Sequence, residues 1–554
     1  MIERESAAPV APNGWDATAD VVVVGGGGGG LPAALFARWL GDEVILLEKA
    51  PELGGTARKA AFWYWVPNNR PMREAGIADP EDGFLRYTAR LSRPHQYDPD
   101  SPTLGLSEWE YGQIRAIYAS ASPAAELLAE RDALPYRWCE AVPDYWSELP
   151  EDAAPTGRVL VPAGARESMS DGGRVGIATM SAAAERDGVD VRVSHRVQRL
   201  VTAGGAVVGV EATTGDGASV RVRARKAVIF ASGGFTHDPE LRANFLSAPV
   251  YGGCAAVTNE GDFVRIGAAA GAQLRNMNQA WMCPVPLEAA VARRPDLSGM
   301  FSVAGDSMLF VDKTGRRVVN EKLPYNELAQ FFFQWDPLSG TYPYLVLVQV
   351  WDQRAQDHSA SDEYGRLIVK DADDSHVLRG ETFAELGDAV RERLAAYAHV
   401  TGGLALSDDW ADNLAASVAR FNELAATGVD ADFGRGERAV QQLFNGDVRE
   451  EPGRSNPTLW PLSDSGPYYA ALVTGGTLDT KGGPKATPDG QVVDALDRPI
   501  PGLYGVGNCV ASPSARAYWA GGATLGPIIA FAYRAANAAH NEPVHEEQEA
   551  AAWR

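Results

Sequence analysis

The most regular stretch of the chain is an apolar run that passes directly into glycines. Residues 20–24 read Asp-Val-Val-Val-Val, six consecutive glycines follow from Gly25 to Gly30, and an Ala- and Leu-rich segment comes next. A β-branched run of this kind predicts a buried parallel strand. The glycines predict a tight turn, and the segment after them predicts a helix. A second apolar run, residues 44–47, predicts a neighbouring strand that ends at Glu48.

Similar strand and helix patterns recur along the chain. We expect helices at residues 113–131, 175–186, 388–397, 410–426 and, after a glycine-rich loop, up to residue 539. We expect strands at residues 62–66, 189–193, 197–211, 218–224, 226–235, 308–311, 317–319, 344–351, 468–473 and 500–508. The mixture predicts an α/β fold in which a Rossmann-like, discontinuous dinucleotide-binding domain carries an inserted α+β domain. We expect residues 1–285 and 475–554 to form the first domain and residues 286–474 to form a cap domain.

Composition narrows the function classes. The chain has 554 residues, enough for a large core divided between two or more domains. Its net charge of −22 argues against nucleic acid and against an anionic membrane surface as partners. The four cysteines are scattered without a C-x-x-C pair, so we expect no disulfide framework, no metal site and a cytoplasmic location. No apolar run approaches the length of about 18 residues that predicts a transmembrane segment.

The first glycines have the spacing of a dinucleotide-binding turn. Gly25, Gly27 and Gly30 satisfy G-x-G-x-x-G, in which the first glycine permits the turn, the second lets backbone approach a pyrophosphate and the third lets helix pack on strand. The helix N-terminus would direct its dipole at the phosphates. Glu48 falls where ribose hydroxyls would lie. A flexible glycine loop is the alternative, and the flanking strand, helix and acid argue against it.

Further motifs occur with this turn, and they occur in a fixed order. They are Gly54-Gly55-Thr56, Val228–Phe235, Arg317 with Asn320-Glu321, and the run from Gly475 to Pro527. The set resembles the flavoprotein family that includes fumarate reductase flavoprotein subunits and the 3-ketosteroid dehydrogenases. Segments 421–436, 476–483 and 518–527 are most similar to the ketosteroid branch. Flavin-dependent cyclohexanone-type dehydrogenases belong to the same branch.

This resemblance implies FAD, bound by the domain made from the two chain ends. The binding is expected to be non-covalent, because no histidine lies just beyond Gly54-Gly55. The implied FAD contacts are Gly25, Gly27, Gly28, Gly29, Gly30, Glu48, Lys49, Gly54, Gly55, Thr56, Ala231, Ser232, Gly233, Gly507, Asn508, Thr524 and Leu525.

The resemblance also implies a reaction, the removal of two hydrogens from adjacent carbons next to a ketone. Tyr518 and the Gly522 N–H would bind the ketone oxygen, and Tyr325 would abstract the α-proton. Either Tyr111 or Tyr118 would assist Tyr325. Two donors on the ketone oxygen stabilise the developing enolate, and the β-hydrogen leaves as hydride to flavin N5. The pKa of a tyrosine base, about 10 when unperturbed, would have to be lowered by a second phenol or a dipole.

The expected substrate is a small hydrophobic ketone, either a 3-ketosteroid or a cyclohexanone-type ketone. Trp65, Trp109 and Trp519 are the candidate pocket residues, and Trp519 stands where the ketosteroid pattern usually has Pro. Together with Trp63, these bulky side chains suggest a site narrower than four steroid rings require. The electron acceptor stays open between oxygen, a quinone and a protein.

Two other functions compete with ketone desaturation. A fumarate reductase-like ene-reductase needs an Arg acid and an Arg/His cluster for two carboxylates, and the eight histidines show no such cluster. A non-catalytic flavin electron carrier would need neither Tyr325 nor Tyr518. Desaturation is therefore favoured on the roles that these residues can fill.

Overall fold

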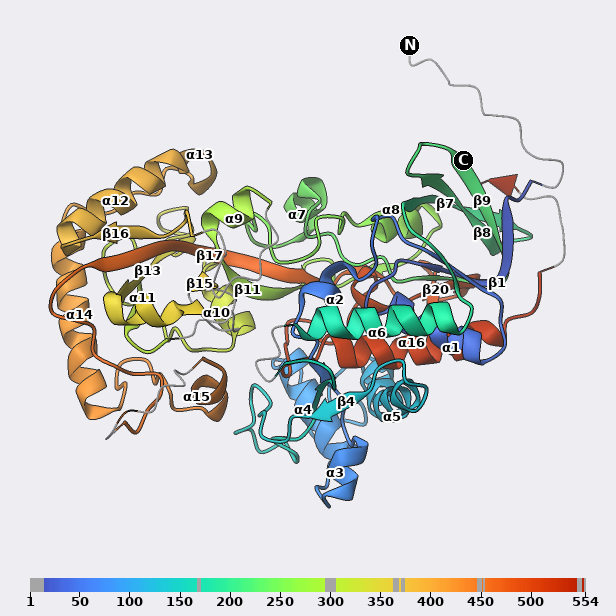
Figure 1. The fold of residues 1–554 in the computed structure, drawn as a ribbon, viewed down its shortest axis with the longest axis horizontal. Helices are drawn as coiled ribbons and strands as arrows, with labels where there is room; N and C mark the ends of the chain where they lie inside the picture. The colour runs from blue at the N-terminus through green and yellow to red at the C-terminus, as the bar shows by residue number, and fades with distance from the viewer. Residues whose placement is uncertain are drawn as a thin grey trace, which may run out of the picture.

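Two β-sheets lie next to each other along the long axis of the molecule (Figure 1). The computed structural model describes residues 14–166, 171–293, 305–361, 368–369, 374–445, 451, 454–545 and 551–552. One sheet has nine strands and the other has five. The α/β class predicted from the sequence is confirmed, with chain segments from both ends meeting in the larger sheet.

The nine-stranded sheet is built around the strand that precedes the glycine turn. Strand β1 (Ala17–Val24) pairs in parallel with β2 (Val44–Leu47) on one side and with β9 (Ser219–Phe230) on the other. From the far end of the chain, β20 (Pro499–Gly505) pairs in parallel with the end of β9. The remaining strands of this sheet are β6 (Asp190–Arg192), β7 (His195–Ala203), β8 (Ala206–Thr214), β19 (Gln491–Val493) and β21 (Ala551–Ala552).

Two strand predictions in this sheet were wrong. The stretch predicted as one strand at 197–211 is the hairpin β7–β8, because Gly204 and Gly205 adopt positive φ values of 59° and 86° and reverse the chain. The two strands predicted at 218–224 and 226–235 are the single strand β9, whose first half pairs with β8 and whose second half pairs with β20. Along one edge of β9, the two halves of the strand therefore pair with different strands.

Helices cover one face of the parallel strands. They are α1 (Gly30–Trp39), α6 (Gly172–Arg186), α16 (Leu525–His540) and α5 (Glu108–Glu130), which packs on α16. Their core includes Val21 and Val23 of β1 with Leu35 and Ile529 from the helices. The helix α5 begins earlier than predicted because Ser107 and Glu110 form a capping box.

The five-stranded sheet is antiparallel. Its order is β11 (Ala280–Pro286), β17 (Tyr468–Thr480), β13 (Val346–Asp352) and β12 (Met308–Val311), with β16 (Leu378–Gly380) also pairing with β17. The predicted strand at 317–319 is reduced to a single bridge between Val311 and Arg317. Helices α12 (Phe383–Ala396) and α14 (Trp410–Thr427) pack in the core on one face, and α10 (Tyr325–Phe331) contacts β11 and β17.

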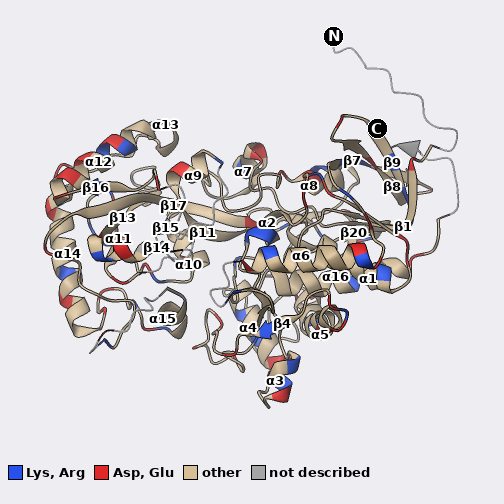
Figure 2. Ribbon diagram, viewed as in Figure 1, with Lys and Arg blue, Asp and Glu red and all other residues tan. Residues whose placement is uncertain are grey.

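Strand β17 connects the two halves of the molecule. It is 13 residues long and runs from the outer helices toward the larger sheet (Figure 1). Its only charged residue is Asp479, near its inner end, whereas the outer helices α12 and α14 carry both signs of charge (Figure 2). The boundary proposed between residues 474 and 475 falls inside β17, so the division into domains stays a proposal.

The other elements connect these layers. They are α2 (Gly55–Lys59), β3 (Tyr64–Trp65), α3 (Arg70–Glu74), α4 (Glu81–Ser92), β4 (Tyr136–Trp138), β5 (Val159–Pro162), α7 (Pro239–Phe245), α8 (Asp262–Ala269), β10 (Leu274–Arg275), α9 (Leu287–Val291), α11 (Gln353–Ser359), β14 (Ala360–Ser361), β15 (Ile368–Val369), α13 (Ala398–Thr401), α15 (Ala439–Asn445), β18 (Gly483–Pro484) and the 3₁₀ turn η1 (Gly507–Cys509). Among the described residues, no helix combines the length and apolar character needed to cross a membrane.

Candidate active site

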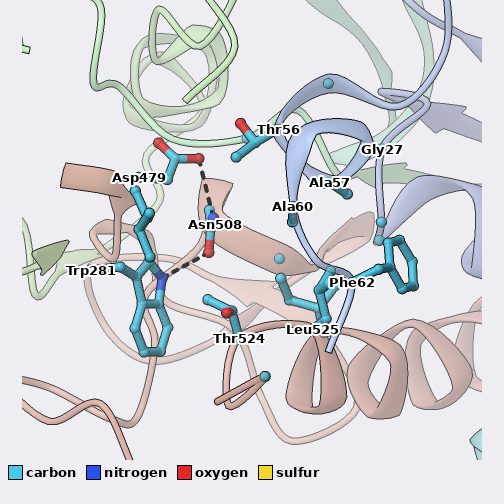
Figure 3. A pocket seen from close by; sticks show the side chains of 18 of the residues that line it. Gly27, Thr56, Ala57, Ala60, Phe62, Trp281, Asp479, Asn508, Thr524 and Leu525 are labelled. Atoms are coloured by element: carbon cyan, nitrogen blue, oxygen red, sulfur yellow. Dashed lines mark hydrogen bonds between the residues drawn. The ribbon is translucent and has the colours of Figure 1, made fainter. Parts of the chain in front are cut away.

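A cavity of about 690 Å³ lies where the two sheets meet. Residues that follow the parallel strands β1, β2 and β9 line it, together with residues of β11, α10 and the loop before α16. Figure 3 shows Gly27, Trp281 and Thr524 among them. The cavity therefore joins the glycine turn to elements of the five-stranded sheet.

The glycine turn brings bare backbone to the cavity wall. A Cβ on Gly25, which has φ +105°, would lie 2.5 Å from the Ala231 carbonyl oxygen. A Cβ on Gly30 would lie 1.7 Å from the Gly25 carbonyl oxygen, so this close packing requires glycine. Gly30 does not itself line the cavity. At Gly27 the nearest atom to a Cβ would be the Gly54 carbonyl oxygen at 3.6 Å, and this residue does line the cavity.

Glu48 is held rigidly at the end of β2. Its Oε2 accepts from the Gly26 N–H at 2.7 Å and its Oε1 accepts from the Ala50 N–H at 2.8 Å. Beside it, Lys49 Nζ donates to Asp262 Oδ2 at 2.6 Å. The oriented carboxylate keeps lone pairs for further donors, which suits a ligand with hydroxyl groups.

The cavity wall fits an extended dinucleotide. A Cβ on Gly55 would meet no heavy atom within 4 Å, and one on Gly507 would come no closer than 3.7 Å to Ile528, so both glycines leave open space. All the predicted FAD contacts except Gly30 line the cavity. Near its middle, Trp281 Nε1 donates to Asn508 Oδ1 at 3.0 Å, and Asn508 Nδ2 donates to Asp479 Oδ2 at 3.1 Å (Figure 3).

Three tyrosines meet in the cavity wall. The ring centroids of Tyr145, Tyr325 and Tyr518 are 5.2–5.5 Å apart in each pairing. Burial and the neighbouring phenols of Tyr145 and Tyr518 raise the pKa of Tyr325, and Tyr518 Oη lies 3.1 Å from Thr524 Oγ1. We call these three residues the tyrosine cluster. The tyrosine end of the cavity is the part that they line with Trp63, Trp281, Val440 and Leu478.

Burial governs the acidity of the tyrosine cluster. Desolvation raises the pKa of Tyr325 well above 10, and the neighbouring Tyr145 and Tyr518 raise it further. Burial also raises the pKa of Tyr518, although hydrogen bonds with Thr524 and Tyr325 lower it in part. The expected lowering of the pKa of Tyr325 is therefore wrong for these surroundings, because a buried phenolate loses its hydration.

A closely packed loop holds Tyr518 and Gly522. The Trp519 carbonyl, next to Tyr518, accepts from the Tyr145 N–H at 3.1 Å and from the Tyr87 hydroxyl at 2.6 Å. Gly522 has φ +84°, and a Cβ there would lie 2.6 Å from the Trp63 carbonyl carbon. Its carbonyl accepts from the Trp65 N–H at 3.0 Å. Its own N–H has no acceptor among the described residues.

The two candidates for the third tyrosine lie elsewhere, so this prediction is corrected. Tyr111 and Tyr118 are on α5 and do not line the cavity. The Tyr118 hydroxyl donates to the Asp79 carbonyl at 2.7 Å, and its ring packs against Phe84. Tyr145, in the loop between β4 and β5, lies in the cavity wall beside Tyr325 instead. Nothing in the local sequence separates it from the other aromatic residues of that region.

The predicted pocket tryptophans are also corrected. Trp65, Trp109 and Trp519 lie outside the cavity wall. Their indole N–H groups donate to Asp144 Oδ1, the Ala486 carbonyl and Ser92 Oγ, at 2.8, 2.7 and 3.2 Å respectively. Each indole N–H thus has an acceptor in the protein interior, which orients the ring away from the cavity. Trp281 lines the cavity, and so does Trp63, which is among the residues predicted to narrow the site.

Comparison with known proteins finds relatives over nearly the whole chain. A sequence model of a family described as FAD binding domain matches residues 20–525. A 4-oxocyclohexanecarboxylate 2-dehydrogenase of Sinomonas cyclohexanicum is 30% identical, covering 94% of this chain and 92% of that protein. A 3-oxosteroid 1-dehydrogenase of Mycolicibacterium smegmatis is 27% identical, covering 93% and 96%. The crystal structure of a 3-ketosteroid delta1-dehydrogenase from Sterolibacterium denitrificans, in complex with 1,4-androstadiene-3,17-dione, has a TM-score of 0.77 at 25% identity, covering 94% of this chain and 99% of that one.

Proposed function

The chain belongs to the FAD binding domain family and is an FAD-dependent oxidoreductase of CH–CH groups, and we propose that it desaturates a cyclic ketone. The product is the α,β-unsaturated ketone, and the substrate is either a 3-ketosteroid or a smaller cyclohexanone-type ketone. The relatives named for a 4-oxocyclohexanecarboxylate and for 3-oxosteroids support this substrate class. The observation that carries the proposal is the tyrosine cluster in the wall of the cavity that fits FAD.

Tyr518 and Gly522 supply two hydrogen-bond donors for the ketone oxygen. The Tyr518 hydroxyl and the Gly522 N–H belong to one loop, and both residues line the cavity. A ketone oxygen between them gains negative charge as the α-proton leaves, and two donors stabilise that charge. In a buried site these hydrogen bonds are stronger than in water.

Tyr325 is the base in this proposal. Its ring packs against the rings of Tyr145 and Tyr518, so the α-carbon would lie beside the same group of phenols that holds the ketone oxygen. As a phenolate, Tyr325 is a strong base because its pKa is raised. The Tyr145 ring meets the Tyr325 ring edge to face and orients it. The proton moves from the substrate α-carbon to Tyr325 Oη.

FAD, when bound, supplies the acceptor for the hydride from the β-carbon. The glycine turn, Glu48, Thr56 and Asn508 would hold it along the cavity. Trp63, Trp281, Val440 and Leu478 give the tyrosine end an apolar wall. Such a wall excludes water and favours a hydrophobic ring over a polar substrate.

The lining charges disfavour the fumarate-type reaction. Among the described residues that line the cavity, the basic side chains are Lys49 and His195. His195 lies beside Glu48, whose carbonyl accepts from its N–H at 2.8 Å. Neither belongs to the tyrosine end, where two substrate carboxylates would need basic partners. The alternative of a non-catalytic electron carrier is disfavoured because such a protein would not need the tyrosine cluster.

Anaerobic mixing of the holoenzyme with a panel of cyclic ketones tests the proposal. Cyclohexanones or 3-ketosteroids should bleach the oxidised flavin spectrum, and the unsaturated ketone should accumulate when an artificial electron acceptor is added. Cyclohexanol, which has the ring without the carbonyl, is the matched control and should leave the spectrum unchanged. A flavin that none of the ketones reduces rules out the proposed activity.

A further inference from the structure

Lys481 is a fully buried lysine beneath the loop that carries Tyr518. It directly follows β17, and its exposed fraction is 0%. Its Nζ donates to the carbonyl oxygen of Ala515 at 3.1 Å and to that of Ala517. The same Nζ lies 3.9 Å from the centroid of the Trp281 ring. Two carbonyls and one π face match the three N–H donors of an ammonium group.

Burial makes this an unfavourable place for an amine. It lowers the pKa of Lys481 well below 10.5, Arg516 lowers it further, and Glu327 opposes them. A methionine would fill the same volume without that penalty. What the lysine adds is the pair of hydrogen bonds to the loop carbonyls.

The loop that receives these hydrogen bonds is strained. Ala515 has φ +46°, in the left-handed region that residues with a Cβ rarely adopt. This strained residue provides one of the two carbonyls bound by Lys481. A strained turn keeps its shape only where its surroundings hold it, and Lys481 is a buried part of those surroundings.

Lys481 also contacts the ring that borders Tyr518. The Trp281 ring meets the Tyr518 ring edge to face, with centroids 4.9 Å apart and an interplanar angle of 65°. Trp281 is fixed at its other edge by the hydrogen bond to Asn508 (Figure 3). The lysine thus touches both the backbone that precedes Tyr518 and the side chain that packs against it.

We propose that Lys481 is a positioning residue for Tyr518. It does not line the cavity, so it acts through the loop and Trp281. This inference rests on the proposed function, in which the Tyr518 hydroxyl donates to the ketone oxygen. Loss of the two carbonyl contacts releases the loop, and a displacement of 1 Å in a catalytic group can cost about 100-fold in rate.

The test compares Lys481→Met with Lys485→Met in the FAD-bound protein. Lys485 is a nearby lysine that pairs with Asp497 and does not touch the Tyr518 loop. In Lys481→Met we expect kcat for a cyclic ketone to fall by about 100-fold, with KM within about threefold. We also expect faster hydrogen exchange at residues 512–520. Lys485→Met should change neither quantity.

Hydrogen exchange needs no substrate, so it separates this inference from the proposed activity. If no ketone reduces the wild-type flavin, the proposed activity is wrong. Unchanged hydrogen exchange in Lys481→Met overturns the positioning role of Lys481 even in that case. Wild-type kcat in Lys481→Met overturns it as well.

If that variant does not fold, Lys481→Gln serves instead, because its amide is one bond too short to reach both carbonyls. A wild-type kcat in Lys481→Gln contradicts the inference, and a decrease of at least about tenfold at unchanged KM supports it.

Discussion

The rings of Tyr325 and Tyr518 lie 5.2 Å apart, centroid to centroid, although the two residues belong to different halves of the molecule. Tyr325 begins α10, which packs against the five-stranded sheet. Tyr518 lies in the loop that leads into α16, a helix of the larger sheet. Both residues line the cavity, so each half of the molecule contributes one phenol to the same part of its wall.

Replacing Tyr325 with phenylalanine tests its role as the base. The variant keeps the ring that packs in the tyrosine cluster and loses only the hydroxyl. We expect the rate of anaerobic flavin reduction by a cyclic ketone to fall by about 10²- to 10⁴-fold, while FAD content stays at the wild-type level. Stopped-flow absorbance measures the rate. Tyr118→Phe is the matched control and should react at the wild-type rate, because Tyr118 lies outside the cavity wall.

The pH dependence follows from the raised pKa of Tyr325. Below that pKa the phenol is protonated, and the phenolate fraction grows about tenfold for each pH unit. We therefore expect log kcat/KM to rise with pH, with a slope of about one, and to level off only above the ordinary tyrosine value of about 10. Steady-state assays across the alkaline range measure this. A plateau already at neutral pH would contradict an unassisted buried phenol as the base.

Gly522→Ala tests the strained loop. A Cβ at this φ of +84° would lie 2.6 Å from the backbone of Trp63. We expect the free energy of unfolding to fall by more than about 1 kcal/mol and ketone turnover to be lost as the loop shifts. Gly340→Ala is the control, since Gly340 has φ +65° and no heavy atom within 4 Å of its Cβ position. Gly340→Ala adds a Cβ at positive φ without a clash, so it measures backbone strain alone. An equal loss of stability in both variants would show that the clash at Gly522 is unimportant.

Glu48→Gln tests the nucleotide end of the cavity. Both carboxylate oxygens of Glu48 accept backbone N–H groups, so the amide of glutamine would place its NH₂ group against an N–H donor. We expect FAD affinity to fall by about tenfold, measured by fluorescence titration of the apoprotein with FAD. Glu52→Gln removes the charge of an exposed carboxylate that pairs with Arg58 and should leave the affinity unchanged. Equal affinities in the two variants would argue against a specific role for Glu48.

Local sequence determined the nucleotide end of this protein. The strand before Gly25, the glycine spacing and the acid at Glu48 act over a short stretch of chain, where sterics and hydrogen bonding to adjacent backbone decide the shape. The turn at Gly522 is also determined by local sequence, because its positive φ requires glycine. The α/β class followed from the same kind of local pattern.

Tertiary structure alone decided which third tyrosine and which tryptophans line the tyrosine end. Tyr145 was one aromatic residue among many in its region, and contacts with a distant loop, including the hydrogen bond from its N–H to the Trp519 carbonyl, bring it beside Tyr518. Trp63 lines the cavity while Trp65, two residues away, binds the buried Asp144. Such choices depend on acceptors supplied by distant segments, and the packing of those segments is not encoded in any local pattern. The raised pKa of Tyr325 likewise comes from burial by both halves of the molecule.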